Sequence, residues 1–159
     1  MKLSELIQQS HDLAVEKGWW EEPDVDEKLL MIHSEISEAV ECYRNYAMHM
    51  EMLKDKPIGF PTEIADVAIR CADLLGYLDD GYKDGDLPIM TFPVLSVSKE
   101  LLLMHRQIES LGTLANNLEI CIDRCYAIAE FVGFDLDEVI RVKHLYNQTR
   151  SRRHGGKRI

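Results

Sequence analysis

Two short acidic motifs hold the side chains of this sequence that are best suited to chemistry. Glu35 and Glu38 form an E-x-x-E pattern, and Glu63 and Asp66 form an E-x-x-D pattern. Each spacing places both carboxylates on neighbouring positions of one helix surface. Residues 39–62 between the motifs suffice to finish one helix, turn and begin an antiparallel partner. Four carboxylates would then converge and repel one another, and a divalent metal ion is the usual reason for such a cluster.

The ligand types indicate which metal this cluster would hold. Carboxylates without a nearby His or Cys favour hard cations, so we predict Mg²⁺ or Mn²⁺. A di-iron bundle would need E-x-x-H motifs, and no Glu of the sequence has a His three residues later. The chain also lacks a G-x-x-x-x-G-K-[ST] phosphate loop. Since Mg²⁺ held by carboxylates usually bridges substrate phosphates, we expect attack of water on phosphorus, with pyrophosphate as the leaving group.

An all-α, antiparallel helix bundle would bring the two motifs together. Apolar residues recur at helical spacing, and Asp24, Thr62 and Asp135 stand where N-caps are expected. A turn is expected over 54–61, and 89–97 is the one stretch that could alternate as a strand. The predicted helices span residues 3–17, 24 to about 50, 62 to about 80, 98–132 with a break near Gly112, and 136 to about 150.

The last predicted helix carries a cationic stripe. Its inward face begins with Leu136, and Lys143, Asn147 and Arg150 continue that face at helical angles. A Lys that faces a purely apolar core would be costly, whereas one that faces carboxylates, metal and phosphate would be well placed. Lys143 and Arg150 are therefore expected to neutralise phosphate charge.

Three more residues are candidates for substrate contact. Arg70 follows Glu63 and Asp66 along the polar line of the third predicted helix. Trp19 and Trp20 lie in the linker after the first helix. Two interpretations of these tryptophans stay open: packing against the bundle, which we favour for one of the pair, and stacking on a flat ring such as a nucleobase.

Composition and charge argue against several classes of protein. A net charge of −10 disfavours an extended nucleic-acid surface. No apolar run is long enough to span a bilayer and residues 1–18 do not read as a signal peptide, so we expect a cytoplasmic protein without a membrane partner. The four cysteines lie in apolar helical stretches and are expected to be buried, reduced thiols. Residues 150–159 hold five basic residues and no acid, so this tail could fray or could reach the body or a phosphate ligand.

The sequence resembles the MazG-like all-α nucleoside triphosphate pyrophosphohydrolases, a superfamily that includes dimeric dUTPases and phosphoribosyl-ATP pyrophosphatases. The signature of that superfamily is E-E-x-x-E followed by E-x-x-D, and this chain reads S-E-I-S-E over 34–38 and E-I-A-D over 63–66. The closing segment is the more specific match, with the stretches G-F-D-L-D at 133–137, K-H-L-Y-N-Q-T-R at 143–150 and R-H-G-G-K at 153–157. The G-W-W stretch at 18–20 is also similar.

The chain length favours one all-α domain over 1–159, of which the resemblance covers roughly residues 18–80 and 131–159. The resemblance implies Mg²⁺-dependent hydrolysis of a nucleoside triphosphate, NTP or dNTP, to the monophosphate and pyrophosphate. It also implies a homodimer or homotetramer with sites shared between subunits. The implied catalytic and metal-holding residues are Glu35, Glu38, Glu63 and Asp66, and the implied phosphate contacts are Lys143, Asn147 and Arg150.

The chain departs from the family pattern in two places. Ser34 stands where the signature has its first Glu, which leaves four acids for the metal and no assigned base. Residues 81–130 exceed the minimal pattern and look like an inserted helical hairpin, either a substrate lid or an oligomer contact. Two other functions stay open: action on another pyrophosphate-linked nucleotide, and a non-catalytic helical adaptor whose acidic face binds a cation or a partner.

Overall fold

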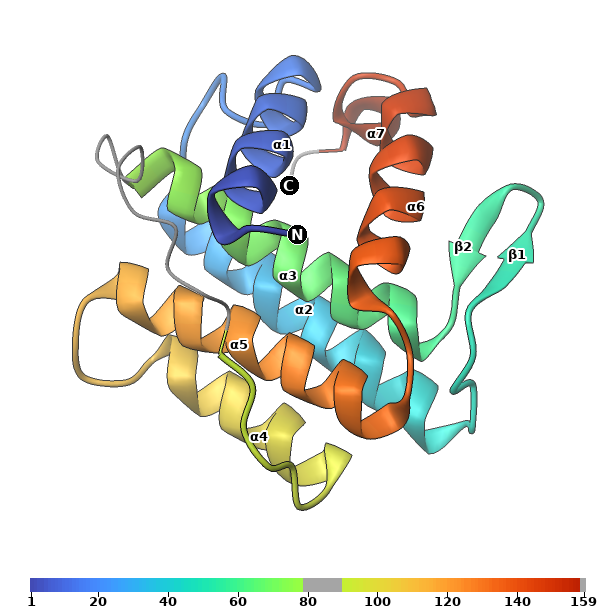
Figure 1. Ribbon diagram of the computed structural model, residues 1–159. Coiled ribbons are helices and arrows are strands. Elements are labelled where there is room, and N and C mark those ends of the chain that lie inside the picture. The colour runs from blue at the N-terminus through green and yellow to red at the C-terminus, as the bar shows by residue number, and fades with distance from the viewer. Residues whose placement is uncertain (79–89, 158–159) are drawn as a thin grey trace.

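The computed structural model describes residues 1–78 and 90–157 and is a packed, mostly helical bundle with one small β-hairpin (Figure 1). Its general class agrees with the sequence prediction. The elements are α1 (Leu3–Glu16), α2 (Val25–Arg44), β1 (Glu51–Leu53), β2 (Lys56–Ile58), α3 (Phe60–Leu78), α4 (Val97–Ile108), α5 (Leu114–Val132), α6 (Leu136–Thr149) and the short α7 (Arg153–Gly156).

Helix α3 is the centre of the bundle. It packs against α1, α2, α5 and α6, and α4 lies below α5 at the base of the molecule (Figure 1). Its buried side chains, which run from Phe60 to Leu75, join those of the other long helices in one continuous apolar core. Because α3 is covered on several sides, the polar residues on its remaining side face a limited space between α2 and α6.

Capping residues account for most of the helix boundaries. Asp24 accepts a hydrogen bond from the backbone N–H of Glu27, and Asp135 accepts one from that of Glu138, so the two predicted N-caps of α2 and α6 are confirmed. The third predicted cap is wrong. Helix α3 begins at Phe60, and the hydroxyl of Thr62 donates to the carbonyl oxygen of Gly59 at 2.6 Å instead of capping the helix.

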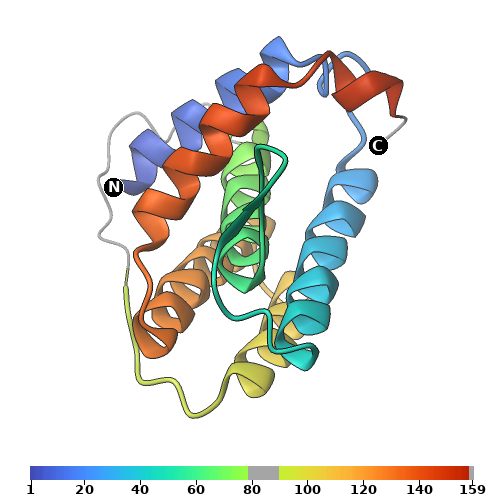
Figure 2. The ribbon, with the colours of Figure 1, turned by 90° about the vertical axis from the view of Figure 1, so that its right-hand side faces the viewer.

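The second helix ends earlier than predicted, and a β-hairpin replaces the expected extension and turn. Helix α2 stops at Arg44, and Tyr46 has a positive φ of 60°, which a continuing helix does not allow. Strands β1 and β2 then pair antiparallel around Lys54 and Asp55, both with positive φ. In Figure 2 the hairpin stands in front of α3, between α6 and α2, and β2 contacts both α3 and α6.

Helices α4 and α5 form the hairpin predicted within 81–130, and they share the main core. Residues such as Leu101, Met104 and Ile122 are fully or almost fully buried there. The strand considered for 89–97 does not form over residues 90–96, and residue 89 lies outside the described residues. All four cysteines are free thiols, as expected, and three are buried, whereas Cys42 is only half-buried, contrary to expectation. Among the described residues, no helix is both long and apolar enough to cross a membrane.

Candidate functional site

One pocket collects nearly all of the residues that the sequence singled out. It lies between α1, α2, α3, α6, the β2 strand and the C-terminal residues, and nothing from α4 or α5 lines it. The substrate-lid interpretation of that hairpin therefore gains no support from the described residues. The pocket is lined by Ser10, Leu13, Ala14, Lys17, Trp19, Lys28, Met31, Glu35, Glu38, Lys56, Glu63, Asp66, Ile69, Arg70, Asp73, Lys143, Asn147, Arg150, His154 and Lys157.

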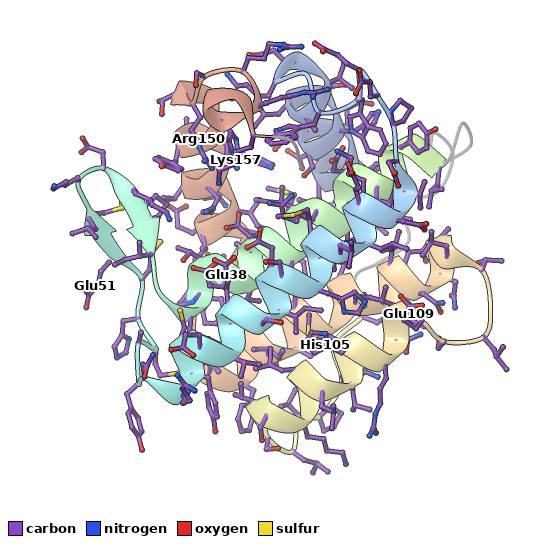
Figure 3. All side chains as sticks on the ribbon, turned by 180° about the vertical axis from the view of Figure 1, so that it is seen from behind. Glu38, Glu51, His105, Glu109, Arg150 and Lys157 are labelled. Atoms are coloured by element: carbon purple, nitrogen blue, oxygen red, sulfur yellow. The ribbon has the colours of Figure 1, made fainter. Side chains whose placement is uncertain are left out.

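The pocket is cationic although the protein is acidic. Seven Lys and Arg side chains line it against five carboxylates, whereas the whole chain carries a net charge of −10. The excess lies on α6 and on the residues after it. In Figure 3, Arg150 and Lys157 come from this end of the chain and lie above Glu38, which belongs to α2. Such a lining favours an anionic ligand.

Three of the four predicted metal-binding carboxylates gather into one group. Glu35 of α2 and Glu63 and Asp66 of α3 each offer an oxygen within 4.8 Å of the others. The fourth, Glu38, lines the same pocket but is exposed and lies outside this group. Its carboxylate accepts a hydrogen bond from the Ser34 hydroxyl at 3.4 Å. The antiparallel packing of α2 on α3 thus unites the two motifs, with Glu38 at the edge.

Two basic residues partly balance the carboxylate group. The Nζ atom of Lys143 lies 2.6 Å from an Asp66 oxygen, and the Lys143 side chain is only 6% exposed. The Nε atom of Arg70 donates to Glu35 at 2.6 Å. Arg70, which we predicted to contact substrate, therefore lines the pocket with its guanidinium already paired to one of the acids. Glu63 has no such partner among the described ion pairs.

Burial and charge repulsion both raise pKa values within the carboxylate group. Burial, and then the nearby carboxylates of Asp66 and Glu35, raise the pKa of Glu63 to about 7. Burial also raises the pKa of Glu35, although the Arg70 guanidinium opposes this effect. When all three carboxylates are ionised, the group carries one more negative charge than Lys143 and Arg70 neutralise.

The donor set fits a hard divalent cation. All three members of the group are carboxylates, and no His or Cys belongs to it among the described residues. Carboxylate oxygens are the preferred ligands of Mg²⁺, and a dication would offset both the burial and the repulsion that raise the pKa of Glu63. Glu35, Glu63 and Asp66 would hold such an ion, whereas Glu38 lines the same pocket outside this group.

Helix α6 presents its predicted polar stripe to the pocket. Lys143, Asn147 and Arg150 all line it. The Asn147 side-chain oxygen is buried and has no hydrogen-bond partner among the described residues. The Arg150 guanidinium lies 5.6 Å from the Tyr146 ring and forms no ion pair within the described part of the chain. These two groups are thus free to bind a ligand.

The two tryptophans have different roles. Trp19 lines the pocket, and its ring meets the edge of His154 at a centroid distance of 5.2 Å. Trp20 does not line it, so this pocket gives no support to the prediction that Trp20 contacts substrate. Its ring stacks on Tyr77 at 4.3 Å, and its Nε1–H donates to Asp73 at 2.7 Å. Packing against the bundle, the interpretation that we favoured for one of the two tryptophans, therefore accounts for Trp20.

Several pocket residues were not predicted individually. Lys28 lies between the tryptophans, with its Nζ atom 4.8 Å from the Trp20 ring centroid, and it donates to the Trp19 carbonyl oxygen. The others are Lys17, Lys56, Asp73, His154 and Lys157. The basic composition of residues 150–159 was the one signal that pointed to part of this set.

Comparisons with protein-family models, with curated proteins and with solved structures give no match for this chain. The likeness to MazG-like enzymes therefore rests on the residues quoted above.

Proposed function

We propose that this protein is a Mg²⁺-dependent hydrolase that converts a nucleoside triphosphate to the monophosphate and pyrophosphate. The observation that carries the proposal is the division of charge within one pocket. Three carboxylates gather on α2 and α3, and a surplus of cations faces the same space from α6, β2 and the C-terminal residues. A metal–polyphosphate complex combines the two kinds of charge that such a pocket would bind.

The chain's own residues supply binding and orientation. Glu35, Glu63 and Asp66 would hold Mg²⁺, which when bound stabilises negative charge on phosphate oxygens and the leaving pyrophosphate. Arg150 offers a free guanidinium to the same phosphates. The Asn147 amide nitrogen can donate to a phosphate oxygen, and its unpaired side-chain oxygen can accept from a hydroxyl of the ligand. Trp19 offers a ring against which the base can lie.

The family resemblance supplies the position of the cleaved bond. Water attacks the α-phosphorus, the bond from this phosphorus to the oxygen that bridges to the β-phosphate breaks, and that oxygen leaves as part of pyrophosphate. The proton of the attacking water is released to a carboxylate of the site or to solvent. The balance is one triphosphate and one water for one monophosphate and one pyrophosphate.

A substrate panel in ¹⁸O-labelled water tests this proposal. The purified protein is incubated with each common NTP and dNTP, with and without Mg²⁺, and products are separated as pyrophosphate, phosphate and nucleotide. We expect pyrophosphate only with Mg²⁺ present, and one ¹⁸O atom in the monophosphate. Release of inorganic phosphate together with the nucleoside diphosphate would overturn the assignment of the cleaved bond. No turnover of any triphosphate would favour the helical adaptor instead.

A further inference from the structure

The residues after α6 form a strap that is fastened to the start of the chain. We define the strap as residues 151–157. The backbone N–H of Arg153 donates to the Lys17 carbonyl oxygen at 3.0 Å, and the Arg153 Nε atom donates to the Gly18 carbonyl oxygen at 3.0 Å. Arg152 forms an ion pair with Glu21, and its Nε atom lies 3.1 Å from that carboxylate. A basic terminus that merely frayed would not make these contacts.

The backbone of the strap is held in an uncommon conformation. Arg153 and His154 have φ of 43° and 48°, and Gly155 and Gly156 that follow are also left-handed. Non-glycine residues rarely adopt this region, and such conformations persist where surrounding contacts fix them, often at ligand sites. The Lys157 N–H closes the turn with a 2.8 Å hydrogen bond to the Arg153 carbonyl oxygen.

The left-handed turn delivers two side chains to the pocket. His154 lies edge to face with Trp19, and Lys157 lines the same pocket near Arg150 (Figure 3). Lys157 forms no ion pair within the described part of the chain, although it belongs to an acidic protein. Burial, and then the positive charges of neighbours such as Arg150, lower the pKa of His154 to about 4, so its ring is neutral at neutral pH. One aromatic residue and one free cation thus reach the pocket through the strap.

We propose that the strap is a nucleotide-binding element, in which His154 and Lys157 contact the base and the phosphates and Arg153 and Glu21 are positioning residues. This inference rests on the proposed function for the identity of the ligand as a nucleoside triphosphate. The chemistry itself belongs to the carboxylate group, so loosening the strap weakens binding and leaves the chemical step largely intact.

The fit at Gly18 offers an independent way to loosen the strap. Gly18 has a φ of +80°, and a Cβ atom there would lie 2.9 Å from a Glu21 oxygen and 3.0 Å from the Arg152 Nε atom. Gly18→Ala therefore disturbs the same fastening from the opposite side. Arg153→Ala removes it from the strap side, and Arg141→Ala serves as the matched control because Arg141 is exposed on α6 outside the pocket.

The experiment measures three quantities for the full chain and these variants. Amide hydrogen exchange at residues 153–157 reports whether the strap is docked. Titration with an α,β-methylene triphosphate analogue and Mg²⁺ gives Kd, and steady-state turnover gives kcat and KM. For Arg153→Ala and Gly18→Ala we expect faster exchange, an about tenfold rise in Kd and KM, and kcat within about twofold of the unmodified chain. Arg141→Ala should match the unmodified chain in all three.

A variant that needs no change in the strap backbone completes the test. Lys157→Ala removes an exposed amine, so the fold is preserved, and Kd should rise by about fivefold because one charge contact to phosphate is lost. Faster exchange in Arg153→Ala with unchanged Kd would overturn the inference. A chain that binds the analogue but turns over no triphosphate would overturn the proposed function alone, and a chain that does not bind it would overturn both.

Discussion

Two buried ion pairs of nearly equal length lie in different halves of the molecule. Lys143 and Asp66 meet at 2.6 Å between α6 and α3, and Arg124 and Glu100 meet at 2.5 Å between α5 and α4. Their side chains are similarly buried, at 6% and 16% exposed for the first pair and 17% and 5% for the second. Length and burial therefore do not distinguish them.

Their neighbours do distinguish them. The Arg124 guanidinium lies over the ring of Phe92, at 5.2 Å from its centroid, and the pair closes the contact between two helices. Asp66 instead has Glu35 and Glu63 within 4.8 Å, so Lys143 faces more negative charge than it can neutralise. One pair balances its charges within the fold, and the other belongs to a group that a cation would complete. The comparison teaches that the surplus charge, and not burial, marks the site.

The largest expected effect is a loss of turnover in Glu63→Gln without a loss of stability. Glu63→Gln should reduce Mg²⁺-dependent turnover by about 1,000-fold, because it removes a proposed metal ligand and so weakens the stabilisation of the transition state by the metal. The free energy of unfolding of the metal-free variant should equal or exceed that of the unmodified chain, since repulsion by Asp66 and Glu35 is removed. Turnover assays and urea unfolding without metal measure the two quantities. The exposed Glu130→Gln on α5 is the control and should change neither.

The opposite outcome is expected for the pair between α4 and α5. Glu100→Gln should lower the free energy of unfolding by about 3 kcal/mol, because Arg124 stays buried without a balancing charge. Turnover per folded molecule should stay within about twofold, since neither residue lines the pocket. Urea unfolding and active-site titration check this. A large loss of turnover in a folded Glu100→Gln protein would contradict the division between the two halves.

Most of the fold follows from local sequence signals, and the hairpin shows where these fail. Asp24 and Asp135 mark helix starts because a cap needs only the next three residues. After Arg44, apolar residues continue as far as Met50, so the sequence predicts a later end for α2 than the structure shows. The hairpin turns at Lys54 and Asp55, without the Asn-Gly or Asp-Gly pair that usually announces such a turn.

The residues of the site also divide into some that local sequence signals predict and others that they do not. Glu35, Glu63, Asp66 and Lys143 could be predicted because regular helices fix their spacing, and two packed helices bring them together. For the strap, the sequence indicated only that a basic tail could reach the body or a phosphate ligand. Its contacts could not be predicted, because Arg153 meets Lys17 and Gly18 across most of the chain and through a left-handed turn. Residues distant in sequence meet only when the whole bundle has formed.

The two adjacent tryptophans allow the same contrast between packing and binding. Trp20→Ala should lower the free energy of unfolding by about 2 kcal/mol, because the stacking on Tyr77 and the hydrogen bond to Asp73 are both lost. Trp19→Ala should change stability less and raise KM for the triphosphate about tenfold, as for the loss of one stacking surface. Thermal unfolding measures the stability of the two variants, and steady-state kinetics measures their KM. Equal effects of both variants on KM would contradict the assignment.

The smallest expected effect is a pH dependence that only the charged pocket should show. The folded protein keeps the proton of Glu63 up to a pKa of about 7, whereas the unfolded chain releases it near 4.5. Between these values the folded state binds more protons, so the stability of the metal-free protein falls as pH rises through this window. Relative to Glu63→Gln, the fall should be about 1 kcal/mol after allowance for solvent screening. Urea unfolding of both proteins between pH 5 and 8 measures the difference.

Saturating Mg²⁺ should abolish this fall in stability, because the cation binds the deprotonated carboxylates and its affinity increases with pH. A slope that is identical in the two proteins would show that the carboxylates of the pocket are as well balanced as the pair between α4 and α5.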